Sequence, residues 1–481
     1  MKVIYSLISV PLALTLAACG GNNSDDAPAG ASNLDINTPT TYAFESPFVA
    51  ATSSVSYPGQ TARQVLINDL TSTIKGLADE QTQDVVADLN FYFDFDSVNS
   101  GGLNYQFNLG SQPLFQGATY DDISTGKNLS GKIAGNDPSL INGEFFGWDT
   151  GSPTTPEALI DHYFSQIHAL ATDGATDQIT LADTSSSAID VNYVAPTGQD
   201  YAQLVQKFLL GAVTYAQGTG DYLKTDFGTN NDAAEIGKSY SSAQHKWDEA
   251  FGYFGAARDY NNYTDDEIAA KGGRAEYAQG YYDSNGDGLI DLYSEYNFGN
   301  SSNCAKRDRG ATVSTDFTKT AFDAFLTGRA ILNKNSNLTN EELNALNEAA
   351  LTASRTWEMC IAATVVHYIN DTVSDMDAFV SNGGYANIAA FKDHAKHWSE
   401  MKGFALGLQF NPDSPFRADL ASLNQLKSLL DLMGDAPVLP DGTQNGIPYS
   451  GGVTQYRADL TAARDIMQSI YNFDAQNVAD W

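Results

Sequence analysis

Apolar residues recur every three to four positions through most of this chain, which is the spacing of an amphipathic α-helix. In the segment 60–77, for example, Val65, Leu66, Leu70 and Ile74 share one face. The same pattern predicts further helices over about 156–171, 201–217, 241–260, 318–332, 339–370, 376–380, 385–409, 418–433 and 454–473. We therefore expect an all-α protein.

The region from about 88 to 153 departs from this pattern. It is rich in Gly, Asn, Ser and aromatic residues, as in the run Asn90-Phe91-Tyr92-Phe93. Local alternation of apolar and polar positions fits one or two short hairpins, and long loops fit equally well. We expect an irregular insertion within the helical protein, and further long loops between the last helices.

The N-terminus has the features of an export signal. Lys2 precedes a largely apolar run over 3–18 that is too short to span a bilayer comfortably. The run ends in Leu16-Ala17-Ala18-Cys19-Gly20, which resembles the bacterial lipobox. The resemblance implies that Cys19 is lipidated and that the protein is sorted to the outer membrane. An ordinary secretory signal is the alternative. The later sequence contains no apolar run long enough for a membrane-spanning helix.

Composition then divides the chain into three parts. Residues 1–18 are the predicted signal peptide, and residues 19–41 are a predicted flexible tether of mostly small and polar residues. Residues 42–481 are the predicted folded domain. We expect it to have two lobes, at about 42–300 and 301–481.

The charge balance is strongly acidic, with 59 Asp and Glu against 26 Lys and Arg and a formal net charge of −33. Such a surface repels nucleic acids and anionic membrane surfaces, so we expect no nucleic-acid partner. It is compatible with cationic ligands, although solubility is sufficient to explain the charge.

The segment 283–291 resembles the calcium loop of an EF-hand. Oxygen-bearing side chains stand at positions one, three, five and nine, and Gly288 at position six permits the sharp turn. Position twelve is Ser294, and Glu295 comes one place late. An Asx-rich turn without metal is the alternative. The predicted calcium-binding residues are Asp283, Asn285, Asp287, Leu289 and Asp291.

A motif of the form Trp-x-Glu-x-x-Gly-aromatic occurs twice, beginning at Trp247 and at Trp398. The copies are too far apart for a solenoid repeat and predict two related helical halves. A histidine precedes each tryptophan, and helical spacing places it near the motif glutamate. Facing helices of a bundle build metal sites from such residues, and this set suits iron, zinc or manganese. The predicted metal ligands are His245, Glu249, His397 and Glu400, with Asp248 and Asp393 as further candidates. The alternative is that they are polar groups within helix packing.

Two cysteines remain after the signal peptide, Cys304 and Cys360. An exported protein can form a disulfide, and these two allow one internal pairing. The sequence does not establish that they lie close enough to bond.

The phrases 245–255 and 397–404 resemble those of a group of uncharacterised bacterial lipoproteins that is distantly similar to imelysin and the iron-regulated periplasmic proteins. The resemblance implies two related helical bundles, a role in iron uptake and an outer-membrane transport partner. Imelysin-like proteins carry Gly-x-His-x-x-Glu. Here His397 and Glu400 match the last part, whereas Ala395 occupies the glycine position.

Three functions follow from these features. The first is a lipid-anchored envelope protein that binds a metal or a metal-containing ligand, with iron or another transition metal as the cofactor. The second is a calcium-stabilised structural or partner-binding lipoprotein. The third is a zinc peptidase, which the sequence favours least because no His-Glu-x-x-His motif or catalytic nucleophile is identifiable.

Overall fold

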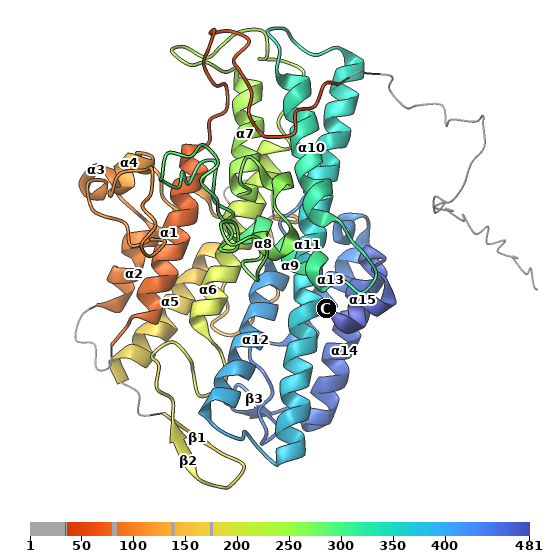
Figure 1. Cartoon of the computed structure of the whole chain (residues 1–481). Helices are drawn as coiled ribbons and strands as arrows, with labels where there is room; N and C mark the ends of the chain where they lie inside the picture. The colour runs from red at the N-terminus through yellow and green to blue at the C-terminus, as the bar shows by residue number, and fades with distance from the viewer. Residues whose placement is uncertain (1–33, 35, 79–83, 136–139, 174–176) are drawn as a thin grey trace, which may run out of the picture. The chain divides into compact units, whose positions relative to one another are not determined.

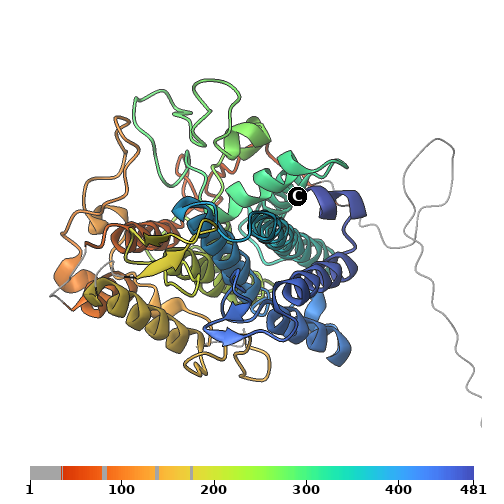
Figure 2. The same cartoon turned by 90° about the horizontal axis from the view of Figure 1, so that it is seen from below.

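Helix α11 (Asn340–Asn382) forms the centre of the fold, where α9, α10, α12, α14 and α15 contact it (Figure 1). Several helices are seen nearly end-on in the view from below, so their axes run roughly parallel (Figure 2). The computed structural model describes residues 34, 36–78, 84–135, 140–173 and 177–481. About 53% of the residues are helical, which confirms the predicted mostly helical class.

The N-terminal half contains the elements α1 (Pro58–Lys75), α2 (Val85–Phe93), α3 (Ser97–Ser100), α4 (Tyr120–Ile123), η1 (Ser130–Lys132), α5 (Pro156–Asp173), β1 (Gln178–Thr180), β2 (Ser186–Ala188), α6 (Tyr201–Leu209), η2 (Leu210–Tyr215), η3 (Gln217–Tyr222) and α7 (Ser242–Phe254). The segments η2 and η3 are π-helical and continue directly from α6. The two strands β1 and β2 pair antiparallel, with Ile179 opposite Ser187.

The remainder contains η4 (Tyr260–Asn262), α8 (Asp265–Ile268), α9 (Gly299–Gly310), α10 (Phe317–Leu332), α11, α12 (Ile388–Gly407), η5 (Pro415–Arg417), α13 (Leu420–Met433), β3 (Thr443–Gln444), β4 (Ile447–Pro448), α14 (Gly452–Tyr471) and α15 (Ala475–Asp480). Strands β3 and β4 form a second antiparallel pair.

Local capping explains where the predicted helices begin and end. Thr339 and Glu342 form the expected capping box at the start of α11. This helix absorbs the predicted helices 339–370 and 376–380, and it ends only at Gly383, whose φ of 75° is left-handed. Helix α7 stops at 254 rather than 260 because Gly255 adopts a left-handed conformation (φ 77°).

Two of the longer helices that the structure describes, α2 and α9, were not predicted. Helix α2 lies at the edge of the expected irregular insertion, whose other described residues form short helical turns, isolated β-bridges and loops. Helix α9 has the sequence GNSSNCAKRDRG, which carries no apolar stripe. A helix of this kind is stabilised by tertiary contacts rather than by its own pattern.

The Glu358 carboxylate on α11 ties several of these helices together. It is fully buried and accepts hydrogen bonds from the hydroxyls of Tyr215 (2.9 Å), Ser414 (2.5 Å) and Tyr471 (2.7 Å) and from the amide of Asn411 (2.5 Å). Burial raises its pKa, and the four donors oppose that rise. The carboxylate therefore joins α11 to η2, to the segment after α12 and to α14.

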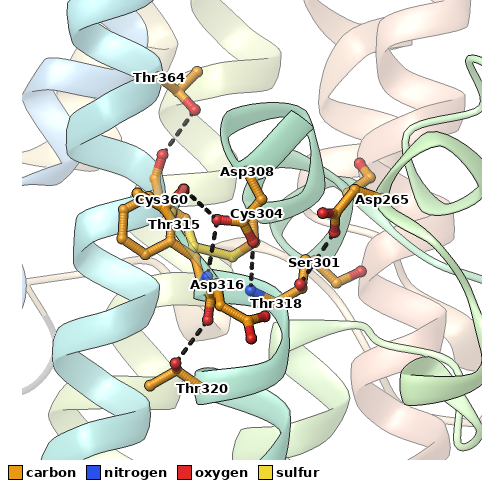
Figure 3. Close-up of a disulfide and its surroundings, with 12 residues drawn as sticks. Asp265, Ser301, Cys304, Asp308, Thr315, Asp316, Thr318, Thr320, Cys360 and Thr364 are labelled. Carbon is orange, nitrogen blue, oxygen red and sulfur yellow. Dashed lines mark hydrogen bonds between the residues drawn. A yellow bond between two sulfur atoms is a disulfide. The ribbon is translucent and has the colours of Figure 1, made fainter. Parts of the chain in front are cut away.

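A disulfide between Cys304 and Cys360 joins α9 to α11, with a Cα–Cα distance of 4.7 Å (Figure 3). The pairing that the sequence left open is thus present. Four residues after Cys304, the Asp308 carboxylate accepts the backbone N–H groups of Phe317 (2.9 Å) and Thr318 (2.8 Å) at the start of α10. The polar helix α9 is held by one covalent bond and by these charge-assisted bonds.

Residues 36–481 form one compact unit, so the predicted lobe boundary near residue 300 does not separate two units. The compact unit also begins six residues before the predicted domain start. No helix among the described residues is long and apolar enough to cross a membrane.

We predict that the double variant Cys304→Ala/Cys360→Ala is less stable by about 2–4 kcal/mol, because the disulfide restricts the unfolded chain. Urea unfolding of the variant and of the oxidised protein measures the difference. Unfolding of the wild-type protein under reducing conditions should match the variant. Equal stability of the oxidised protein and the variant would contradict the prediction.

Candidate functional site

The first motif lies on α7, and its glutamate is bound within that region. The Glu249 carboxylate accepts a hydrogen bond from Gln60 of α1 (3.1 Å) and lies 3.9 Å from the ammonium of Lys246. His245 Nε2 lies 3.9 Å from the same carboxylate. Its Nδ1 is 3.0 Å from the backbone carbonyl of Ser56. His245 and Glu249 therefore lie close together. The other residues that contact them here, Ser56, Gln60 and Lys246, belong to the N-terminal segments and to α7.

Asp248, a further metal candidate, makes a buried structural contact. Its carboxylate bonds to the Arg329 guanidinium (2.8 Å) and the Tyr42 hydroxyl (2.9 Å), and all three side chains are fully buried. Burial raises the pKa of Asp248, whereas Arg329 opposes the rise. Asp393 on α12 is exposed and has no hydrogen bond or ion pair with any residue that the structure describes.

The second motif lies on α12. His397 Nδ1 is 2.8 Å from Asp375 Oδ2, and His397 Nε2 is 3.9 Å from Asp371. Burial would lower the pKa of His397, but the hydrogen bond and charge of Asp375 raise it. The Glu400 carboxylate is 3.3 Å from the ammonium of Lys207 on α6. A protonated His397 between carboxylates is an ion pair rather than a free metal ligand.

The predicted convergence of the two motifs is not found. Helix α7 packs against α1, α10 and η3, whereas α12 packs against α6, η2 and α11. Figure 1 places α7 near the top of the view and α12 in its lower half. Within the described ranges, no group of three or more His, Cys, Asp or Glu side chains could hold a metal ion. The zinc peptidase hypothesis, which needs about three protein ligands, gains no support from this arrangement.

The repeated motif instead organises helix contacts at both of its copies. Both tryptophans are fully buried, and Trp247 Nε1 donates to the Phe325 carbonyl (3.0 Å) while Trp398 Nε1 donates to the Tyr456 hydroxyl (2.9 Å). Gly403 allows α6 to approach, because a Cβ there would lie 2.8 Å from that of Lys207. Glu400, three residues before this glycine, also bonds to Lys207 of α6. Packing between helices, the alternative to metal binding, therefore accounts for the motif.

Around Glu400 the structure gathers an unusual number of cations for an acidic protein. We call this set the α12 cluster. Its members, which lie on α6, α9, α11 and α12, are Lys207, Lys306, Arg307, Tyr368, Lys396 and Glu400. Lys396 lies 3.9 Å from the second oxygen of Glu400, so this one carboxylate already faces two ammonium groups.

Lys306 and Arg307 are left without a carboxylate partner. Arg307 is 7% exposed, and its Nε is buried without a hydrogen bond. Neither side chain makes a hydrogen bond or ion pair with any described residue. Burial, together with Lys207 and Arg307, lowers the pKa of Lys306 to about 8, and burial lowers that of Arg307 to about 10. An unpaired buried charge is costly, so the buried guanidinium of Arg307 is suited to pairing with an anion.

The sequence did contain one signal for this cluster. Residues 306–309 read Lys-Arg-Asp-Arg, which is the densest basic run of the chain. The outermost of them, Arg309, is about half exposed and pairs with Asp266, whereas Lys306 is half-buried and Arg307 is buried. Without a predicted helix in this segment, the burial of Arg307 could not be foreseen.

The predicted calcium loop is an ordered turn on the surface. The Asp283 carboxylate accepts backbone N–H bonds from Gly286 (2.7 Å) and Gly288 (2.7 Å). Asn285 and Asp287 accept similar bonds from within the loop. These bonds hold the oxygen-bearing side chains of the first three positions in a fixed arrangement around the turn.

Glu295 bonds to the backbone of this loop. It is 1% exposed, and its carboxylate accepts the backbone N–H groups of Ser284 (2.8 Å) and Asp291 (2.9 Å). Asp291 in turn accepts a bond from Gln116 (2.6 Å), whose own oxygen accepts the Leu292 N–H (3.0 Å). The loop is therefore tied to the irregular insertion, and turns rather than a pair of helices flank it.

The signal peptide, the lipidation site Cys19 and most of the tether (19–41) lie outside the described residues. They remain predictions from the sequence.

A family model described as a domain of unknown function (DUF4856) matches residues 39–436. The chain belongs to the DUF4856 family. The match begins close to the predicted end of the tether and spans both tryptophan motifs, the loop at 283–291 and all of the α12 cluster. Helices α14 and α15 extend the core of this DUF4856 protein beyond the matched region. No curated protein and no solved structure matches the chain.

We predict that calcium raises the melting temperature of the protein and that Asp287→Ala abolishes this rise, because binding to the folded state alone stabilises it. Differential scanning fluorimetry with calcium, magnesium and chelator measures the effect. Asp266→Ala, which removes an exposed carboxylate elsewhere, is the matched control and should retain the calcium response. An unchanged response in Asp287→Ala would contradict the assignment.

Proposed function

We propose that this protein is a lipid-anchored component of the bacterial cell envelope that binds a small anionic ligand at the α12 cluster. The observation that carries the proposal is the buried Arg307 guanidinium beside the half-buried Lys306, neither of which pairs with a carboxylate among the described residues. A guanidinium and an ammonium complement a carboxylate or phosphate, and the guanidinium can do so through two parallel hydrogen bonds.

The surrounding residues favour recognition of the anion over chemistry on it. Lys207 and Lys396 already balance Glu400, so they set the position of that carboxylate. The Tyr368 hydroxyl faces the same carboxylate, and burial together with Glu400 raises the pKa of the phenol. The neutral phenol has a single O–H donor, which Glu400 accepts, so Tyr368 helps to hold that carboxylate in place.

An anionic metal complex is one ligand of this class. Such a complex supplies its own metal ligands, so the protein needs only complementary charge and hydrogen bonds. The resemblance to imelysin and the iron-regulated periplasmic proteins supports iron as the metal and an outer-membrane transport protein as the partner. Direct ligation by His397 and Glu400 is supported less well, because both are held by other side chains.

The anchor in this proposal is the lipid on Cys19, with residues 19–41 as the tether. The lipobox-like run 16–20 supports it. A lipid anchor would hold an otherwise water-exposed helical body at the membrane surface.

The second candidate function is a calcium-stabilised structural or partner-binding lipoprotein. The buried Glu295 and the ordered loop above it favour this function. The two functions are compatible, since the loop and the α12 cluster share no residue.

We predict that Lys306→Gln and Arg307→Gln each weaken binding of citrate, ferric citrate or phosphate by about tenfold or more, because a charge-assisted hydrogen bond contributes roughly 1.5–3 kcal/mol. Isothermal titration calorimetry of the purified protein measures the affinities. Arg309→Gln is the matched control, since Arg309 lies on the same helix but is exposed and pairs with Asp266. Equal losses in all three variants, or none, would count against the proposed site.

The lowered pKa of Lys306 also predicts a pH dependence. With a pKa of about 8, Lys306 is a cation below that pH and loses its charge as the pH rises through it. Binding should therefore be strongest below pH 8 and should fall above it. Titrations from pH 6 to pH 10 test this, and Lys306→Arg should flatten the profile because arginine keeps its charge. A flat wild-type profile would contradict the role of Lys306.

A further inference from the structure

A second gathering of cations surrounds the glutamate of the first motif. We call it the α7 cluster. Its members, which come from α1, η1, η3, α7 and the segment before η1, are Arg63, Lys127, Lys132, Asp221, Tyr222, Lys246 and Glu249. The set has four cations and two carboxylates in a chain whose formal net charge is −33.

The carboxylates of this cluster do not balance its cations. Lys132 lies 4.0 Å from Asp221, and Lys246 lies 3.9 Å from Glu249. Arg63 is buried and donates to two backbone carbonyls, at 2.7 and 3.3 Å. The ammonium of Lys127 has no hydrogen bond or ion pair with any described residue. Two positive charges, those of Arg63 and Lys127, are therefore left without a carboxylate.

The cluster also has a defined shape. Lys132 and Lys246 both lie over the ring of Tyr222, at 5.3 and 4.7 Å from its centre. The Lys127 side chain lies against Gly59, where a Cβ would meet it at 2.7 Å, and this glycine is the second residue of α1. The N-terminus of α1 adds partial positive charge on the same side.

Solvent and small molecules can reach this cluster. The side chains of Lys132, Lys246 and Asp221 are 30%, 37% and 40% exposed. Burial and the neighbouring Arg63 lower the pKa of both Lys127 and Lys132, as expected where cations crowd together.

We infer that the α7 cluster is a second binding site for a small oxyanion, a phosphate or carboxylate group, separate from the α12 cluster. The two sites occupy corresponding places in the two halves, since each is built beside the glutamate of a Trp-x-Glu-x-x-Gly motif. The ligand is a soluble small molecule, because the overall negative charge opposes approach to an anionic lipid surface.

The test counts binding sites. Titration calorimetry of the wild-type protein with inorganic phosphate and with citrate should give two sites per chain. Lys127→Gln/Lys132→Gln should lose one site and keep the other. Lys306→Gln should lose the other, and the triple variant should bind neither probe. Lys238→Gln, at an exposed lysine outside both clusters, is the control and should keep both sites.

The outcomes separate this inference from the proposed function. One wild-type site that disappears only in Lys306→Gln overturns the second site and leaves the proposed function intact. One site that disappears only in Lys127→Gln/Lys132→Gln overturns the proposed site at the α12 cluster and leaves the site at the α7 cluster intact. Absence of binding overturns both sites for oxyanions.

Lys127→Arg/Lys132→Arg should bind as the wild type does, which separates loss of charge from loss of folding. Binding to phosphatidylglycerol vesicles in place of phosphate and citrate would overturn the assignment to a soluble ligand.

Discussion

The buried Glu358 carboxylate is the interaction on which the arrangement of this protein depends most. It forms no ion pair with any residue that the structure describes, and four hydrogen-bond donors from three other parts of the chain hold it. Each carboxylate oxygen accepts two of these bonds, so removing one donor would leave a buried, charged oxygen with a single hydrogen bond. The donors therefore specify how η2, the segment after α12 and α14 meet α11. Two residues further along, Cys360 fixes α9 to the same helix. The other helices are therefore positioned against α11, and so are the residues of the α12 cluster that they carry.

Charge distribution gives the fold its second constraint. An acidic chain with few basic residues would be expected to pair each of them with a carboxylate at the surface. Here several are gathered beside Glu249 and Glu400, and some remain unpaired after burial. Each glutamate also bonds to the neighbouring helix that packs closely against the glycine of its motif. The repeated motif is thus a packing element that places one carboxylate among cations twice, and the proposed ligand class rests on the excess of positive charge there.

Much of the helical architecture could be predicted from apolar periodicity and capping signals. The capping box at Thr339 and the start of α5 at Pro156 are of this kind, because local sequence decides them. Helix α9 could not be predicted, since its residues have no apolar stripe and its stability comes from Cys360 and from bonds to α10. The site was missed for the same reason, because Lys306 and Arg307 lie on that helix. His397 and Glu400 were predicted as metal ligands, and the structure places them beside Asp375 and Lys207.

The sequence by itself determined the helical class, the repeated motif, the DxNxDG turn and the acidic balance, because each depends on residue order over a few turns of chain. Only the tertiary structure decided that the two motifs stay apart, that Cys304 meets Cys360 and that Arg307 is buried. These outcomes depend on which helices pack together, and that choice is a sum over long-range contacts such as those of Glu358. A side chain's chemistry is local, but its burial and its partners are properties of the whole fold.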